Sequence, residues 1–105
     1  MLRTVLTLLA LLAAGSASAQ GFTAGALASM CSSQAQAASC AFYLQGYAEG
    51  RNQALGRPTI CIPPNAPLPT VVAGFAAHIE KNRLEANIAA GLVVGNYLLA
   101  TYPCR

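Results

Sequence analysis

The sequence predicts an all-α fold, a small disulfide-stapled bundle of about four helices. Apolar residues recur at intervals of three and four in separate segments, which is the spacing of a single helix face. The alternating pattern of half-buried strands does not occur. Four cysteines follow an N-terminal apolar stretch, and an even number of cysteines in an exported chain indicates two disulfides.

The first 19 residues have the pattern of a cleavable signal peptide. Arg3 supplies a positive charge, residues 5–14 form an apolar stretch that Thr7 alone interrupts, and residues 17–19 read Ala-Ser-Ala. The apolar stretch is far shorter than the about 20 residues of a spanning helix. We therefore expect cleavage after Ala19, no membrane span in the mature protein, and one domain over residues 20–105.

Charged residues are scarce in this chain. It carries six Lys and Arg residues and three acidic residues, all of them glutamate. Because the basic residues are scattered rather than clustered, nucleic acid is not expected as a partner. With 55% hydrophobic and 9% charged residues, some apolar surface should stay exposed on the monomer and be covered by a partner.

The N-terminal half is predicted to form two helices. The first is expected over residues 24–30, with Thr23 as its N-cap, and the second should start at a capping box of Ser33 and Gln36. The stretch Gly56-Arg57-Pro58 should end the second helix. One face of that helix is predicted to carry Cys40, Tyr43, Leu44 and Tyr47.

A proline-rich segment separates this half from a third helix. Residues 57–69, here called the proline loop, hold five of the six prolines, which predicts an ordered, extended loop. Pro69 fits the first turn of the third helix, where its missing N–H group costs nothing. The apolar face of that helix is predicted to carry Val72, Phe75, Ala76 and Ile79.

A fourth helix is predicted to begin near Asn82, with Glu85 as its capping partner, and to end at Pro103. Gly91 and Gly95 lie one turn apart and should let a neighbouring backbone approach, within the molecule or across a dimer contact. The inward face is predicted to carry Leu84, Ile88, Leu92, Leu99 and Tyr102.

Helix directions constrain the disulfide pairing. In an antiparallel bundle the first helix ends where the second begins, so Cys31 should lie near Cys40. The second and fourth helices run parallel and end at the opposite pole, which brings Cys61 close to Cys104. This geometry favours Cys31–Cys40 and Cys61–Cys104 among the three possible pairings.

The sequence offers little catalytic chemistry. His78 is the single histidine, and the chain has no Asp to orient it. A Cys–His nucleophile would require one cysteine outside the disulfides and would leave another unpaired. Without a C-x-x-C pair, a zinc site is also disfavoured. We expect a protein that is not an enzyme, with neither metal nor cofactor.

Three short motifs occur in order along the chain: Cys40-Ala41-Phe42-Tyr43-Leu44-Gln45-Gly46, Cys61-Ile62-Pro63 and Tyr102-Pro103-Cys104. Together with the flanking Cys31 and the predicted signal peptide, they resemble the Tai-type periplasmic immunity protein family. The resemblance extends from about Phe22 to the C-terminus. It implies a compact helical protein that binds a type VI secretion peptidoglycan amidase effector in the periplasm and blocks its catalytic groove. It also implies a homodimer.

The chain departs from the family pattern at three positions. Glu49 stands where the family usually has Asp, and Thr70 where it usually has Gln. The segment His78-Ile79-Glu80 corresponds to a His-Pro-Glu turn whose proline is missing here.

The best candidate for effector contact is the turn after the third helix. It concentrates polar and charged groups in His78, Glu80, Lys81, Asn82 and Arg83, and such groups on an exposed turn give specificity. Asn65 in the proline loop is a second candidate. The alternative interpretation of the turn is a solvated connection between helices.

Two other functions remain open at this stage. A periplasmic acid-stress chaperone could have the same size and fold, but it needs many carboxylates to titrate, and this chain has three. An effector-less envelope interaction module of the same family would have the same sequence features.

Overall fold

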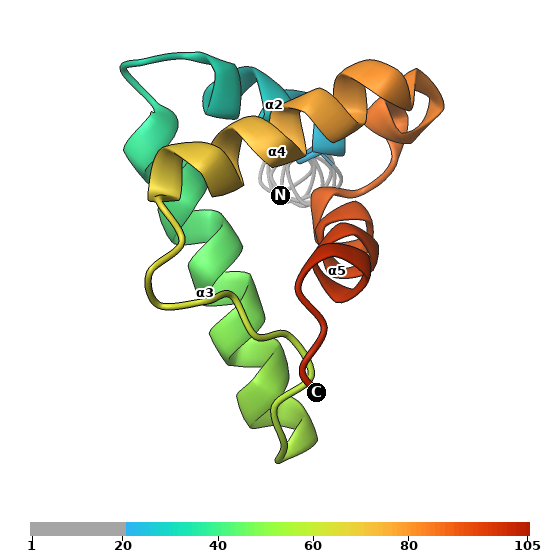
Figure 1. Cartoon of the computed structure of the whole chain (residues 1–105). Helices are drawn as coiled ribbons and strands as arrows, with labels where there is room; N and C mark the ends of the chain where they lie inside the picture. The colour runs from blue at the N-terminus through green and yellow to red at the C-terminus, as the bar shows by residue number, and fades with distance from the viewer. Residues whose placement is uncertain (1–20) are drawn as a thin grey trace, which may run out of the picture.

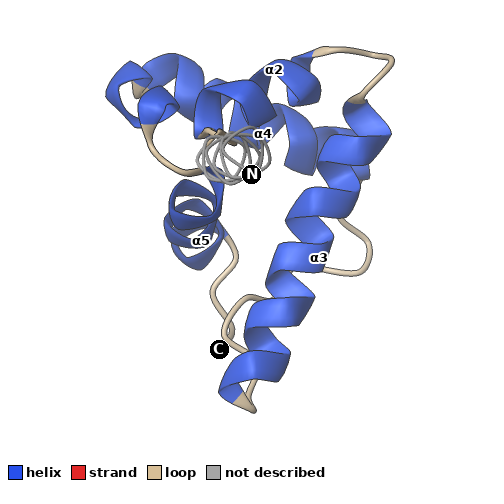
Figure 2. Cartoon of the chain, turned by 180° about the vertical axis from the view of Figure 1, so that it is seen from behind, coloured by secondary structure: helices blue, strands red, loops and turns tan. Residues whose placement is uncertain are grey.

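The computed structural model describes residues 21–105, and within them the predicted all-α class is confirmed (Figures 1 and 2). The predicted signal peptide lies outside the described residues. Isolated β-bridges rather than strands accompany the helices in the described part. The elements are α2 (Ala24–Ser32), α3 (Ala37–Leu55), α4 (Leu68–Lys81), the 3₁₀ helix η1 (Arg83–Asn87) and α5 (Ala90–Thr101).

Helix α2 begins as predicted at Thr23. The Thr23 side chain accepts a hydrogen bond from the Ala26 amide at 3.2 Å, which satisfies one of the free N–H groups of the first turn. The buried side of α2 is formed by Ala24, Leu27, Ala28 and Cys31.

The predicted capping box of α3 is wrong. Ser33 is the C-cap of α2, and its backbone N–H donates to Met30 O. Gln36 is the N-cap of α3 but its side chain makes no capping hydrogen bond. Its backbone N–H donates to Ser33 O at 3.1 Å. A backbone turn therefore replaces the side-chain box. At the other end Gly56 adopts φ 68°, the left-handed conformation that ends helices and favours glycine.

The predicted face of α3 agrees with the structure, and that of α4 agrees at Val72, Phe75 and Ile79, while Ala76 is only partly buried. Cys40 and Leu44 are buried, while Tyr43 and Tyr47 are partly buried against the core. Helix α4 starts at Leu68, so the last two residues of the proline loop belong to it, and Pro69 lies in the first turn as predicted. The buried face of α4 is formed by Val71, Val72, Phe75 and Ile79.

The fourth predicted helix is wrong in its start and its face. The chain forms η1 over Arg83–Asn87, then extends at Ile88 with ψ 152°, and α5 begins only at Ala90. The break occurs because residues 22–24 pair with residues 88–90, where Ala24 N–H donates to Ile88 O and Ala90 N–H to Phe22 O.

The break shifts the helical phase, so the predicted inward residues do not form the core. Leu84 is 91% exposed and Leu92 is 61% exposed, and Ile88 is exposed as well. Leu99 and Tyr102 are partly buried. The side chains of this region that are buried are Ala90, Val93, Val94 and Leu98.

Of the two glycines of α5, Gly95 permits a close approach, and it does so to a side chain rather than to a backbone. A Cβ on Gly95 would overlap the Tyr47 hydroxyl, and a Cβ on Gly91 would touch Tyr47 and Tyr43. Gly95 is therefore explained by tyrosine packing between α3 and α5 within one molecule.

Both predicted disulfides are confirmed. Cys31–Cys40 links the end of α2 to the first turns of α3, with a Cα–Cα distance of 5.1 Å. Cys61–Cys104 links the proline loop to the chain end, with a Cα–Cα distance of 4.9 Å. Helices α3 and α5 end toward the same pole, as the pairing argument required (Figure 1).

Candidate functional site

The polar turn, defined here as residues 78–85, joins the end of α4 to η1. Asn82 ends α4: its backbone N–H donates to His78 O at 3.0 Å, and its side-chain Nδ2 donates to the same oxygen at 2.8 Å. Nδ2 also lies 3.4 Å from His78 Nδ1. Because both the backbone and the side chain of Asn82 donate to the His78 carbonyl, the chain is held where it leaves α4.

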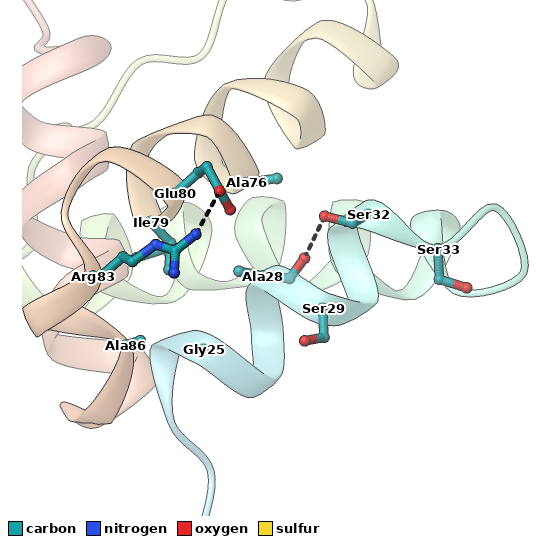
Figure 3. Close-up of a pocket in the computed structure, with 10 residues that line it drawn as sticks. All are labelled: Gly25, Ala28, Ser29, Ser32, Ser33, Ala76, Ile79, Glu80, Arg83 and Ala86. Carbon is teal, nitrogen blue, oxygen red and sulfur yellow. Dashed lines mark hydrogen bonds and ion pairs between the residues drawn. The ribbon is translucent and has the colours of Figure 1, made fainter.

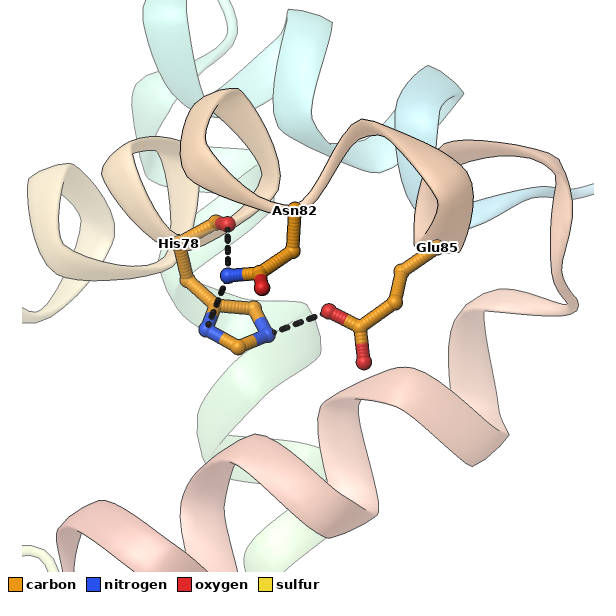
Figure 4. A network of polar contacts seen from close by, with 3 residues as sticks. All are labelled: His78, Asn82 and Glu85. Atoms are coloured by element: carbon orange, nitrogen blue, oxygen red, sulfur yellow. Dashed lines mark hydrogen bonds and ion pairs between the residues drawn. The ribbon is translucent and has the colours of Figure 1, made fainter.

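His78, near the end of α4, contacts Glu85 of η1 (Figure 4). Its Nε2 lies 2.7 Å from Glu85 Oε2, and both side chains are about two-thirds covered. Glu85 Oε2 is shielded from solvent and receives no well-directed hydrogen bond within residues 21–105, so the imidazole is the polar group that faces it. The predicted capping role of Glu85 is wrong, since its carboxylate reaches His78.

An aromatic platform supports the imidazole from the side of the core. The Tyr97 ring of α5 lies 5.0 Å from the His78 ring between centroids, and Tyr97 packs edge-on against buried Phe75. Burial raises the pKa of the Tyr97 phenol, and the neighbouring Tyr102 raises it further against a hydrogen bond with Thr101 that lowers it. Tyr97 is therefore a neutral ring at physiological pH.

The outer edge of the polar turn carries its exposed charges. Arg83 and Glu80 form an ion pair at 2.9 Å, with side chains that are 79% and 74% exposed. Lys81 is exposed and forms no ion pair within the described residues. The structure thus brings together all five predicted residues of the turn, as a fixed inner part and an exposed charged edge.

Asn65, the second candidate, lies elsewhere. It is exposed in the proline loop, which leads into the start of α4, whereas the polar turn follows the end of α4 (Figure 1). A helix of 14 residues separates the two positions by about 20 Å. Asn65 and the polar turn are therefore not one site.

Sequence reasoning missed the structural role of Asn52, which holds the proline loop against α3. Its Oδ1 accepts hydrogen bonds from the Thr59 amide at 2.7 Å, the Thr59 hydroxyl at 3.0 Å and the Ile60 amide at 3.1 Å. Its Nδ2 donates to Ile60 O at 2.9 Å. The Asn52–Thr59 separation of seven residues is the only sequence signal, and it is a weak one.

All four cysteines are in disulfides, so the chain has no thiol nucleophile. Within residues 21–105 no three His, Cys, Asp or Glu side chains are grouped to hold a metal ion. In the same residues no helix is both long and apolar enough to cross a membrane. The polar turn presents exposed charged side chains on an ordered backbone.

The described residues form a small, disulfide-bonded helical protein with an exposed charged turn. Residues 15–104 match the family model of Rap1a immunity proteins, and the chain belongs to this family. Rap1a is a type VI secretion immunity family, which confirms the predicted immunity class. No curated protein and no solved structure matches the chain.

Membership of this family bears on partner, catalysis and location. An immunity family implies binding to a protein effector, and such families are not catalytic in general. Together with the two disulfides, it indicates an exported protein.

Proposed function

We propose that this chain is a periplasmic immunity protein that binds a type VI secretion peptidoglycan amidase and blocks its catalytic groove. The type VI immunity family and the three Tai-like motifs support this proposal. In the structure those motifs supply the buried start of α3 and the Cys61–Cys104 bridge, so they define the scaffold. An inhibitor needs such a scaffold and a projecting contact surface, with no catalytic set of its own.

The observation that carries the proposal is the construction of the polar turn. Its inner residues Asn82 and His78 are held by hydrogen bonds, by the close contact of His78 with Glu85 and by ring packing, while Glu80 and Arg83 stay exposed. A turn that is already ordered loses little conformational freedom on binding. We therefore assign effector contact to the charged edge of this turn, with Asn65 as a separate candidate.

Location and assembly are part of the same proposal. The periplasm is the oxidising compartment in which the two disulfides persist and in which peptidoglycan is reached, and the proposed signal peptide of residues 1–19 would direct the domain there. Large exposed apolar side chains such as Phe42, 73% exposed, favour a homodimer that covers them.

The test begins with capture of the effector by the mature, oxidised protein from secreted proteins of the source bacterium. Support requires that the captured protein is an amidase and that its cleavage of purified peptidoglycan stops when the immunity protein is bound. A captured amidase that still cleaves peptidoglycan in the complex contradicts the proposal. Capture of proteins without amidase activity does so as well.

Mutation then tests the contact surface. Replacement of Glu80, Lys81 and Arg83 together by Ala should weaken inhibition by about 100-fold or more, because the charged edge is removed. The matched control replaces one acidic and two basic exposed residues away from the turn: Glu49, Arg57 and Arg105. The control should inhibit like the wild type. Equal inhibition by both triple variants, each with an unchanged melting temperature, would remove the turn from the contact surface.

A further inference from the structure

Leu84 is the most exposed large apolar side chain among residues 21–105, with 91% of its surface open to solvent. The next in order, Phe42, is 73% exposed. Single exposed leucines are common on protein surfaces, so exposure alone assigns Leu84 no role. Its place in the chain is the informative point, because it follows Arg83 directly and lies within the polar turn.

We propose that Leu84 is the apolar anchor of the effector contact, the side chain that inserts into an apolar pocket of the effector. This inference rests on the proposed function and adds an apolar centre to its charged edge. Such an anchor must be exposed in the free protein, must stand on an ordered backbone, and must be surrounded by groups that keep water out of the contact.

The backbone around Leu84 is held by its neighbours. The Glu85 N–H donates to Asn82 O at 3.0 Å, which closes a turn over Leu84. Ala86 lies against Gly25 of α2, where an added Cβ would be 3.0 Å from the Ala86 carbonyl oxygen (Figure 3). Binding would therefore restrict the side chain of Leu84 but little of its backbone.

Polar groups flank Leu84 on the exposed side of η1. Glu85 and Ala86 are half-buried and form the inner side of this helix. Arg83, Leu84 and Asn87 are exposed, and Asn87 follows Leu84 by one 3₁₀ turn, on the same side. An apolar centre within a polar rim is the arrangement in which a few residues carry most of the binding free energy, because the rim excludes water from the centre.

A second copy of the chain is the other partner that could cover Leu84. One leucine supplies only a small part of the about 800 Å² that each partner buries in a stable interface, so the surrounding charged edge must take part. That edge carries Lys81 and Arg83 against the single carboxylate of Glu80 and is positive overall. A two-fold contact centred on Leu84 would bring two such edges together, and like charges oppose that association. A different protein can present complementary groups, so we assign Leu84 to the effector.

The first test is Leu84→Ala, with Leu55→Ala as its matched control. Leu55 is 52% exposed at the end of α3, far from η1 (Figure 1). The probe is the purified amidase that the wild-type chain inhibits, with isolated peptidoglycan as substrate. We expect Leu84→Ala to weaken inhibition by about 10- to 100-fold, as burial of a leucine side chain implies, and Leu55→Ala to change it by less than about 2-fold. Both variants should melt near the wild-type temperature, because both side chains are exposed in the free protein.

Binding kinetics then separate an apolar anchor from a charged contact. Leu84→Ala should raise the dissociation rate of the complex and leave the association rate within about 2-fold, at low and at high salt. The alanine variant of residues 80, 81 and 83 should also change the association rate, and that change should shrink as salt screens the charges. Leu84→Met keeps an apolar side chain of similar volume and should inhibit within about 5-fold of the wild type.

The outcomes separate this inference from the proposed function. Wild-type inhibition by Leu84→Ala would overturn the anchor assignment, and so would a loss that lies in the association rate. A Leu84→Ala variant that still inhibits but no longer sediments as the wild type does would place Leu84 between copies of the chain and overturn it as well. In each case the proposed function still stands if the wild-type chain inhibits the amidase. If the wild-type chain inhibits no amidase, the proposed function falls and this inference falls with it.

Discussion

Asn52→Ala tests whether one side chain holds the proline loop against α3. The substitution removes four hydrogen bonds between Asn52 and the backbone and hydroxyl groups of Thr59 and Ile60. At about 1 kcal/mol for each bond the upper limit is about 4 kcal/mol. Three bonds share one oxygen, and Ala favours the helix by up to about 0.7 kcal/mol. We therefore expect a loss of about 2–3 kcal/mol in the free energy of unfolding.

The assay is urea denaturation of the oxidised protein, followed by circular dichroism. A two-state fit should give an unchanged m-value and a lower midpoint, because the surface exposed on unfolding stays the same. In a thermal scan the same loss corresponds to a melting temperature roughly 10–20 °C lower for a domain of this size.

Asn65→Ala is the matched control. It removes the same side chain from an exposed position of the proline loop and should change the stability by less than about 0.5 kcal/mol. Equal stabilities of Asn52→Ala and Asn65→Ala would refute the reasoning, since they would mean that water replaces the Asn52 bonds without loss.

Three further predictions concern packing, disulfides and pH. Gly95→Ala should lower the free energy of unfolding by about 1–3 kcal/mol, because the new methyl group overlaps the Tyr47 hydroxyl. Adding Tyr47→Phe should recover part of this loss, and no recovery in urea denaturation would contradict the packing. Cys104→Ser should lower the unfolding free energy by about 2–4 kcal/mol, and Cys31→Ser by about 1 kcal/mol less, because it opens a loop of 9 rather than 43 residues; the opposite order in the same assay would be inconsistent with the entropic model. Because burial raises the pKa of Tyr97, the folded protein holds that proton more tightly than the unfolded chain, so this contribution is complete below pH about 10 and is lost as the pH rises through the folded pKa. Urea midpoints measured at rising alkaline pH should fall less steeply for Tyr97→Phe than for the wild type, and identical slopes would exclude the effect.

Local signals in the sequence were sufficient where structure depends on neighbours along the chain. The Thr23 cap, the glycine stop at Gly56 and the position of Pro69 all involve backbone groups within one helical turn. The disulfide pairing was also predictable, because helix order alone places Cys31 beside Cys40 and brings the other two cysteines to the opposite pole.

The missed features depend on contacts between distant segments. A periodic apolar pattern runs from Leu84 through Leu92, and nothing local interrupts it. The interruption comes from residues 22–24, which pair with residues 88–90 more than 60 positions away. Asn52 was missed for a related reason, since its partners lie in an irregular loop whose path no sequence pattern specifies.

The candidate site was predicted as a group of residues but not in its internal roles. The concentration of charges in residues 78–83 identified the turn. It could not distinguish the fixed His78 from the exposed Arg83, because that difference arises from Tyr97 on one side and Glu85 on the other. The Glu85 carboxylate was predicted to cap the fourth helix, but the structure interrupts that helix at residues 88–89, so the cap does not form.

The position of η1, and with it the polar turn, depends on the N-terminal end of the described chain. Gly25 lies against Ala86, where an added Cβ would be 3.0 Å from the Ala86 carbonyl oxygen. Two backbone hydrogen bonds between residues 22–24 and residues 88–90 hold the segment that follows η1. The His78–Glu85 contact requires η1 at this place, because Glu85 belongs to it and His78 to α4. Residues 22–25 therefore support the surface that we assign to effector binding.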